Sequence, residues 1–175
     1  MINPFLIGSN IYLRGLELND AEGNYPFWLN DQSVNSFNTH GRLPYDKSQA
    51  IDYITSTIGS NKNLILAIVD KKTDNHIGNI SLQSIDYISR SAEFAILIGE
   101  KTFFGKGIGY EAASLIIDHG FKTLNLHRIG CGTSSENIAM QKLAIKLGMK
   151  EEGIRKDAIF KNGNFFDILE YGLIK

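Results

Sequence analysis

The residues best suited to chemistry lie in the stretch Ser91–Ala113, which reads SAEFAILIGEKTFFGKGIGYEAA. Its pattern predicts a buried strand, a glycine-rich loop and the first turns of a helix. The N–H groups at a helix start have no partner within the helix, and the positive end of the helix dipole lies there. Because Gly105, Gly107 and Gly109 add no Cβ atoms, this backbone can approach a bulky anion, with Lys106 as a nearby cation. The stretch therefore predicts a phosphate cradle.

Two common phosphate-binding motifs do not fit this spacing. The dinucleotide fingerprint G-x-G-x-x-G would start at Gly105 and Gly107, but Tyr110 occupies the third glycine position. A nucleoside-triphosphate loop ends in G-K-[ST], whereas Gly107 stands where the Ser or Thr should be. A flexible glycine loop ahead of an ordinary helix remains the alternative to the cradle.

A second stretch suited to chemistry begins at Asn137. Asn137, Met140, Ala144 and Leu147 fall at helical spacing and share one face of a predicted helix. A carboxamide at this position can bind a ligand, but Asn is also a favoured helix cap, and both interpretations stay open.

The elements that must position these residues follow from the periodicity of apolar side chains. Short alternating or continuous apolar runs predict strands over 11–16, 64–70, 76–85, 92–99, 127–133, 150–160 and 165–173. We expect a mixed helical region over 20–37 and helices over 46–58, 107–123 and 137–147, with Asp20, Asp31 and Asp46 as candidate caps. Asn162-Gly163 is a strong hairpin signal between the last two strands. This order predicts an α/β or α+β fold with a mixed sheet, with 92–99 at its centre.

The composition is that of one globular domain spanning residues 1–175. Hydrophobic residues make up 43% and charged residues 21%, and the net charge of −1 disfavours nucleic acid or a membrane surface as partner. The N-terminus has no signal-peptide pattern, no stretch approaches about 20 apolar residues, and the single cysteine, Cys131, fits a reducing compartment. We therefore expect a cytoplasmic protein. The four histidines show no metal-ligand spacing, so no metal site is predicted.

Six short blocks follow one another between residues 92 and 167: AEFAILI, GKGIGYEA, DHGF-x5-HRI, SSEN, KLGMKEEG and F-x-NG-x-FFD. Together they resemble the GNAT superfamily of acyl-CoA-dependent N-acetyltransferases, nearest to its spermidine, ribosomal-protein N-terminal and amino-sugar branch. The segments LRGL-x3-D near Leu13 and WLND at Trp28 extend the resemblance more weakly toward the N-terminus. Six blocks in order are far more specific than one glycine loop.

The resemblance implies a mixed, mostly antiparallel twisted sheet flanked by helices, in which two central parallel strands splay into a V that holds acetyl-CoA. Main-chain groups of Ile96, Leu97 and Ile98 would bind the pantetheine arm and polarise the thioester carbonyl. Asn137 would bind the cofactor close to its sulfur. The pyrophosphate would lie on Phe104, Gly105, Lys106, Gly107, Ile108 and Gly109, in agreement with the cradle inferred from the residues themselves.

Three positions depart from the family pattern. The loop usually opens with Gln or Arg where this chain has Phe104. Many members carry a Tyr as general acid where this chain has Ala144, and some ribosomal-protein enzymes carry a Ser where it has Met140. The main-chain cradle tolerates the first change, but the proton donor for the leaving thiolate is left unassigned.

The reaction also needs a proton acceptor, because an aliphatic amine with a pKa of about 10 is mostly protonated at neutral pH. Glu93 is our candidate catalytic base. It shares a strand face with Ala95 and Leu97, so we expect partial burial, which would strengthen it as a base. The alternative is a structural glutamate paired with Arg90 or Arg128.

Three residues are candidate contacts for the acceptor: Trp28, Asp31 and His40. Asp31 suits a cationic amine, although helix capping is the more ordinary role for it. We predict a single-domain enzyme that moves the acetyl group of acetyl-CoA directly to a primary amine, on a small molecule such as a nucleotide-linked amino sugar. The alternative acceptor is a polyamine or a protein N-terminus. The alternative from another class of function is a non-catalytic acyl-CoA-binding module. The chain is also a possible homo-oligomer.

Overall fold

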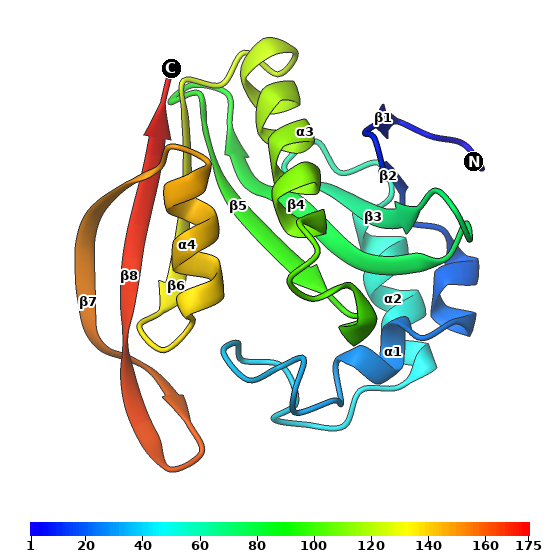
Figure 1. Cartoon of the computed structure of the whole chain (residues 1–175), viewed down its shortest axis with the longest axis horizontal. Coiled ribbons are helices and arrows are strands. Elements are labelled where there is room, and N and C mark those ends of the chain that lie inside the picture. Colours follow the sequence, from blue (N-terminus) through cyan, green and yellow to red (C-terminus); the bar gives the residue numbers. More distant parts are fainter.

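The computed structural model describes all 175 residues, and its centre is one twisted sheet of eight strands (Figure 1). The strands lie in the order β1-β2-β3-β4-β5-β6-β8-β7, and β5 with β6 is the parallel pair among otherwise antiparallel neighbours. Their bounds are β1 Leu6–Ile7, β2 Ile11–Gly15, β3 Leu64–Asp70, β4 His76–Asp86, β5 Ser91–Ile98, β6 Arg128–Ser134, β7 Lys150–Lys161 and β8 Asn164–Ile174. The predicted mixed sheet is confirmed, and the short strand β1 was not predicted.

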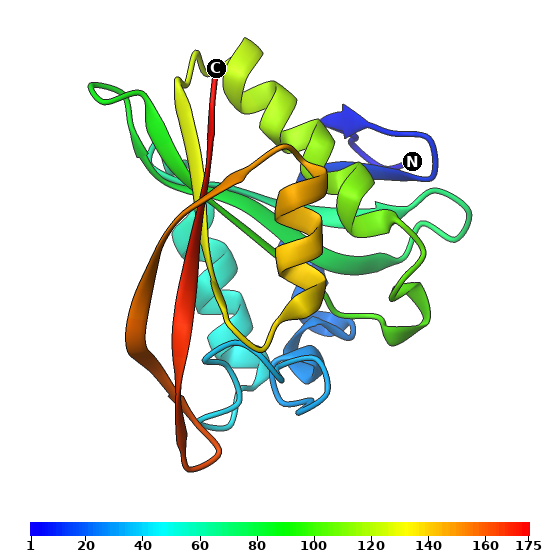
Figure 2. The same cartoon turned by 60° about the vertical axis from the view of Figure 1, so that its left-hand side comes forward.

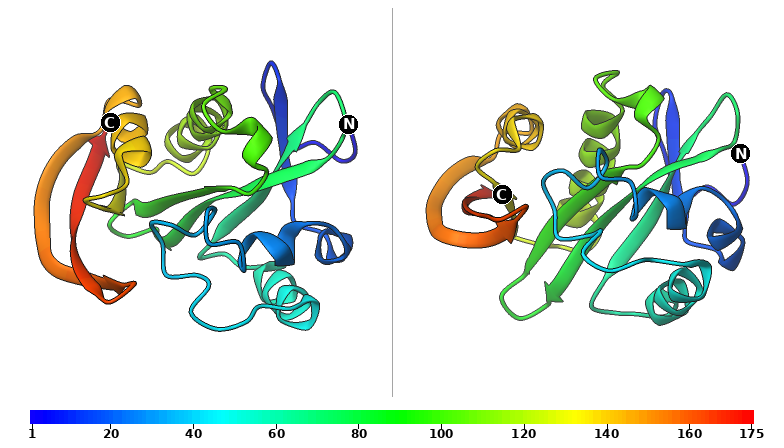
Figure 3. Two further views of the ribbon diagram at one scale, coloured as in Figure 1. Left: turned by 60° about the horizontal axis from the view of Figure 1, so that its bottom comes forward. Right: turned by 90° about the horizontal axis from the view of Figure 1, so that it is seen from below.

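Helices cover both faces of the sheet (Figure 3). They are η1 Leu18–Glu22, α1 Tyr25–Trp28, α2 Lys47–Thr57, η2 Lys101–Phe103, α3 Ile108–Lys122 and α4 Ile138–Lys146. Successive strand residues point to opposite faces, so Ile11 and Leu13 enter a main core with α3, whereas Tyr12 enters a second core with α1 and α2. The chain contains no helix whose length and hydropathy would let it span a lipid bilayer.

The parallel strands β5 and β6 pair only briefly. Their register runs from Ser91 opposite Arg128 to Glu93 opposite Gly130, after which the two strands diverge (Figure 1). Beyond this point β5 stays paired with β4, and β6 stays paired with β8. The edge of β5 from Phe94 to Ile98 that faces β6 therefore has no strand partner, which is the predicted V.

The N-terminal helical region is shorter than the prediction, and no helix begins at Asp31. Asp31 Oδ1 instead accepts hydrogen bonds from the main-chain N and the hydroxyl of Ser33, at 2.8 and 2.7 Å, which forms a turn. Asp20 is not the N-cap of η1 but its third residue, and its Oδ2 accepts a hydrogen bond from Glu17 N at 2.8 Å as one half of a capping box. Its carboxylate receives two hydrogen bonds from the buried Arg14, at 2.7 and 2.9 Å, because a buried guanidinium requires a charged partner.

The two other turn and cap predictions are confirmed. Asp46 caps α2 through a reciprocal pair of hydrogen bonds with Gln49, at 2.9 and 3.1 Å. Asn162 and Gly163 have φ angles of 50° and 82°, which the tight hairpin turn between β7 and β8 requires. The long β7–β8 hairpin extends to the end of the molecule where the segment after α1 lies (Figure 2).

Candidate active site

The glycine loop ahead of α3 has the features of an anion cradle. Gly105 and Gly107 have φ angles of 71° and 81°, and a Cβ atom added to either would meet no other atom within 4 Å. Gly107 is the N-cap of α3, and the N–H groups of both glycines have no acceptor within the protein. Free N–H groups, open space and the helix N-terminus together favour a bound phosphate.

The charges around the loop agree with this role. Lys106 is an exposed cation beside the ring of Phe103, at 5.8 Å from its centroid, and Phe104 is 47% exposed. The carboxylate in the first turn of α3, Glu111, binds Asn10 N and Nδ2 at 2.8 and 3.0 Å and Ile11 N at 3.3 Å. Although burial acts to raise its pKa, these hydrogen bonds outweigh burial and lower the pKa of Glu111. This contact ties α3 to the first strands.

The unpaired edge of β5 lies directly before the cradle in the chain. Ile96, Leu97 and Ile98 are half-buried and pair with β4 on one side only. Gly109 of α3 packs near Ile96 and near Leu143 of α4, with its Cβ position at 3.8 and 3.9 Å from them. The V is therefore bordered by β5, α3 and α4, and it offers unpaired main-chain groups to an extended ligand.

Asn137 caps α4. Its Oδ1 accepts a hydrogen bond from Met140 N at 3.1 Å, as the capping interpretation requires, while its Nδ2 donates to no protein atom. The cap therefore leaves an amide donor free for a ligand. Ala144 is fully buried in the main core, and Met140 packs against it, so neither position supplies an acid.

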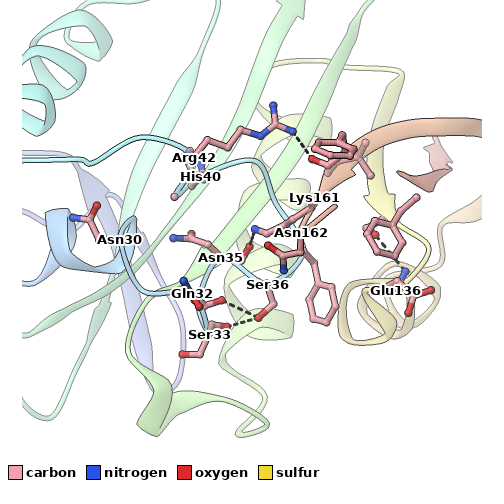
Figure 4. Close-up of a pocket in the computed structure, with 16 residues that line it drawn as sticks. Asn30, Gln32, Ser33, Asn35, Ser36, His40, Arg42, Glu136, Lys161 and Asn162 are labelled. Carbon is pink, nitrogen blue, oxygen red and sulfur yellow. Dashed lines mark hydrogen bonds between the residues drawn. The ribbon is translucent and has the colours of Figure 1, made fainter. Parts of the chain in front are cut away.

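A cavity of about 900 Å³ is lined in part by Ser134 and Glu136, which shortly precede Asn137 in the chain (Figure 4). Three segments form its walls: the loop after α1, the end of β6 and the tip of the β7–β8 hairpin. The polar and aromatic side chains that line it are Asn30, Gln32, Ser33, Asn35, Ser36, Phe37, His40, Arg42, Ser134, Glu136, Phe160, Lys161, Asn162 and Phe166. Its lining thus joins parts of the chain that are far apart in sequence.

The three predicted acceptor contacts lie in different places. His40 lines the cavity, where burial and the neighbouring Lys161 lower its pKa. Trp28 is only 4% exposed and belongs to the second core, where its Nε1 donates to Glu100 at 3.0 Å. Asp31 lies outside the cavity lining and pairs with Lys101 at 2.8 Å. The structure therefore brings His40 to the cavity and gives Trp28 and Asp31 contacts that hold the loop after β5.

Glu93 lies at the apex of the V, as the last residue of β5 that pairs with β6. The expectation of partial burial is wrong, because Glu93 and Ala95 occupy a stretch of the sheet face that the helices leave exposed. The structural alternative is not seen either, since Arg90 donates to Asn125 O at 2.7 Å and Arg128 pairs with Glu152. The carboxylate is free, but it does not line the cavity.

Sequence reasoning missed three charged residues of the cavity: Arg42, Glu136 and Lys161. Glu136 directly precedes Asn137 within the SSEN block, so its position in the chain was a usable signal. Arg42 and Lys161 gave no such signal, because nothing in the spacing of two distant basic residues shows that they meet.

Comparisons with known proteins bear on the family to which the chain belongs. Residues 10–150 match the family described as Acetyltransferase (GNAT) domain. The chain is 31% identical to the uncharacterized N-acetyltransferase p20 of Bacillus licheniformis, over 97% of this chain and 96% of that protein. It is 36% identical to the spermidine N(1)-acetyltransferase of Vibrio cholerae over 58% of each chain.

A solved structure gives the same result for the fold. The spermidine N-acetyltransferase of Vibrio cholerae in complex with CoA and spermine superposes with a TM-score of 0.84 and 28% identity, covering 94% of this chain and 95% of that one. These matches favour an enzyme over a non-catalytic CoA-binding module. The chain belongs to the GNAT family of acetyl-CoA-dependent N-acetyltransferases.

Proposed function

We propose that this chain, acting as one domain, transfers the acetyl group of acetyl-CoA directly to a primary amine of a small molecule. The observation that carries the proposal is the short stretch of chain at the end of β6. Ser134 of this stretch lines the cavity, and Asn137 caps α4, which borders the V together with the unpaired edge of β5. Glu136, which lines the cavity, is the direct neighbour of Asn137, the free amide donor beside the V.

In our proposal the residues that the sequence assigned to the cofactor hold acetyl-CoA. The pyrophosphate is held by the N–H groups of Gly105 and Gly107, by the start of α3 at Ile108 and by the cation of Lys106. Main-chain groups of Ile96–Ile98 align the extended pantetheine arm, and Asn137 Nδ2 donates to its end. Bound acetyl-CoA supplies a thioester whose carbonyl carbon accepts the amine.

The chain must also move protons. The ammonium form of the amine first loses a proton. Its nitrogen then forms a bond to the acetyl carbon, and the carbon–sulfur bond of the thioester breaks. We propose that Glu93 accepts this proton through water, because its carboxylate is exposed at the apex of the V. Glu136, which lines the cavity, is the alternative base. The thiolate is then protonated by water or by the proton that the amine releases, since Ala144 and Met140 cannot donate one.

The acceptor that we propose is an amino sugar linked to a nucleotide. A polyamine is the second candidate, because the relatives include spermidine acetyltransferases. The cavity lining offers a polyamine a single carboxylate, Glu136, against the cations Arg42 and Lys161. A protein N-terminus is a third candidate.

The test is release of CoA thiol from acetyl-CoA with a panel of amines. The panel contains nucleotide-linked amino sugars, spermidine and peptides with free N-termini. We expect turnover with the amino sugars and little with spermidine. Tight acetyl-CoA binding without turnover on any member would contradict the proposed acceptors, and absence of acetyl-CoA binding would contradict the function itself.

A further inference from the structure

Two cations of the acceptor cavity have no carboxylate partner. Arg42 Nη2 donates to the carbonyl oxygen of Phe160 at 2.8 Å, which leaves most of the guanidinium donors free. Lys161 Nζ donates to the carbonyl oxygens of Asn35 and, at 2.7 Å, of Asn38. Carbonyl oxygens carry only partial charge, so the two positive charges remain uncompensated (Figure 4).

The same cations influence each other. Burial and the charge of Arg42 lower the pKa of Lys161, and burial and the charge of Lys161 lower the pKa of His40. Repulsion of this kind is costly for the empty site and is relieved when an anion binds among the three groups. Glu136 is the one carboxylate of the lining, and it forms no ion pair with them.

The remaining lining indicates what accompanies the anion. Phe37 and Phe160 both line the cavity and are 43% and 48% exposed, so their rings offer apolar surface to a planar group. The volume of about 900 Å³ lies near the top of the usual range for small-molecule sites, and is far more than a simple amine requires.

The loop that carries Arg42 also contains an unsatisfied polar atom. Asn35 is 1% exposed, and its Nδ2 donates to the carbonyl oxygens of Trp28 and Leu29 at 3.0 and 2.7 Å. Its Oδ1 is the buried side-chain polar atom of the chain that has no hydrogen-bond partner. An unpaired buried acceptor is unusual in a folded protein, and it fits a loop that completes its hydrogen bonds with ligand present.

We propose that Arg42 and Lys161, with His40 beside them, form a phosphate subsite that selects the acceptor by its nucleoside diphosphate. Phe37 and Phe160 contact the nucleoside, and the amine lies toward Glu136 and Asn137. This inference rests on the proposed acetyl transfer and deepens it, because it names the residues that determine which amines are accepted. A polyamine, which is cationic, is rejected by the same pair.

Binding of UDP to the CoA-saturated protein tests the subsite. Saturation with CoA fills the glycine cradle, so the probe's phosphates have only the cavity cations available. By calorimetry we expect UDP to bind more tightly than uridine, with an affinity that falls as salt is added. Arg42→Gln and Lys161→Gln should each weaken UDP binding about tenfold or more, because each removes a charge-assisted hydrogen bond.

Lys72→Gln is the matched control. Lys72 is exposed in the β3–β4 turn and its replacement changes the net charge equally, so UDP affinity should be unchanged. CoA affinity should be unchanged in all three variants, and Arg42→Lys should recover part of the UDP affinity if the loop fold is intact. With an accepted nucleotide-linked amine, Arg42→Gln should raise KM and leave kcat nearly constant.

Two results would overturn the subsite. One is UDP binding no tighter than uridine binding in the wild-type protein, a measurement that requires no variant to fold. The other is equal UDP affinity in Arg42→Gln, Lys161→Gln and Lys72→Gln. If either result is found while the protein binds CoA and acetylates another amine, the proposed acetyl transfer is retained. Absence of CoA binding by the wild-type protein would contradict both the acetyl transfer and the subsite.

Discussion

The two sides of the site that we propose, one for the cofactor and one for the acceptor, are built in different ways. The cofactor side consists of β5, the glycine loop and α3, which follow one another within residues 91–122. Its groups are mainly main-chain atoms, exposed by a broken strand pairing and by two glycines of positive φ. The acceptor side is made of side chains from three segments, joined by contacts such as Arg42 to Phe160 and Lys161 to Asn38.

This difference explains why one side can be recognised and the other cannot. A main-chain site needs glycines and a helix start at fixed spacing, and such a pattern can be read from a short stretch. A side-chain site assembled across distant segments places no such demand on local sequence. The acceptor side is therefore where relatives with the same cofactor can differ in substrate.

Several contacts join the N-terminal part of the chain to the end of β5 and the loop that follows it. The indole of Trp28, from the N-terminal part, lies against Gly99 at the end of β5, where a Cβ atom would stand 1.9 Å from Trp28 Cδ2. Glu100, the next residue, accepts hydrogen bonds from Trp28 Nε1 at 3.0 Å and Asn24 Nδ2 at 2.8 Å. The start of the acceptor loop is thereby fixed relative to the cofactor strand.

The largest effect is expected from removing the proposed catalytic base, and this experiment also shows which side of the site supplies that base. Glu93→Gln should lower kcat by about 10²- to 10⁴-fold with CoA affinity retained, because a positioned base contributes that much. Glu136→Gln is the matched variant from the cavity. If Glu136→Gln abolishes turnover and Glu93→Gln does not, the base belongs to the acceptor side and our assignment of Glu93 is wrong. The pH–rate profiles of both variants are the measurement.

Breaking the contact between the two sides should cost stability. We expect Gly99→Val to lower the free energy of unfolding by about 3 kcal/mol, because the added side chain overlaps the Trp28 indole and neither backbone can move freely. Gly15→Val is the control, since a Cβ atom there meets nothing within 4 Å. Equal urea midpoints for the two variants would show that the contact is not tight.

Filling the cradle should separate the two sides functionally. Gly107→Leu should weaken CoA binding about tenfold to a hundredfold, because its side chain occupies space that the pyrophosphate needs, while UDP binding to the cavity stays unchanged. Gly59→Leu is the control, since Gly59 also has positive φ and open surroundings and so carries the same backbone strain. Equal CoA affinity in the two variants would refute the cradle.

The smallest effect concerns the ion pair that anchors the N-terminal part. Burial alone would raise the pKa of Asp20, but hydrogen bonds from Arg14 and His76 outweigh it and hold the pKa well below its usual value. A carboxyl with a depressed folded-state pKa stabilises the protein above its unfolded pKa of about 4, and this stabilisation is lost as the pH falls further. Unfolding free energy should therefore decline below pH 4 by on the order of 2 kcal/mol. Asp20→Asn should show a shallower decline, and an identical slope would exclude Asp20 as its source.

The sequence by itself determined seven of the eight strands, their order along the chain, the glycine loop ahead of α3 and the cap of α4. These features depend on local rules: apolar periodicity, positive φ at Gly107 and Gly163, and a polar side chain before a helix. The N-terminal helices were predicted less well, because Asp31 forms a turn with Ser33 and an ion pair with Lys101, and because Asp20 caps η1 from its third position while it also binds Arg14.

Only the tertiary structure decided the exposure of Glu93, the burial of Trp28 and the meeting of Arg42 with Lys161. Each depends on what covers a residue from elsewhere in the chain, and packing between distant segments leaves no periodic trace in the sequence. The fold and the cofactor chemistry were readable because they rest on the backbone. The acceptor chemistry was not, because it rests on side chains that folding brings together.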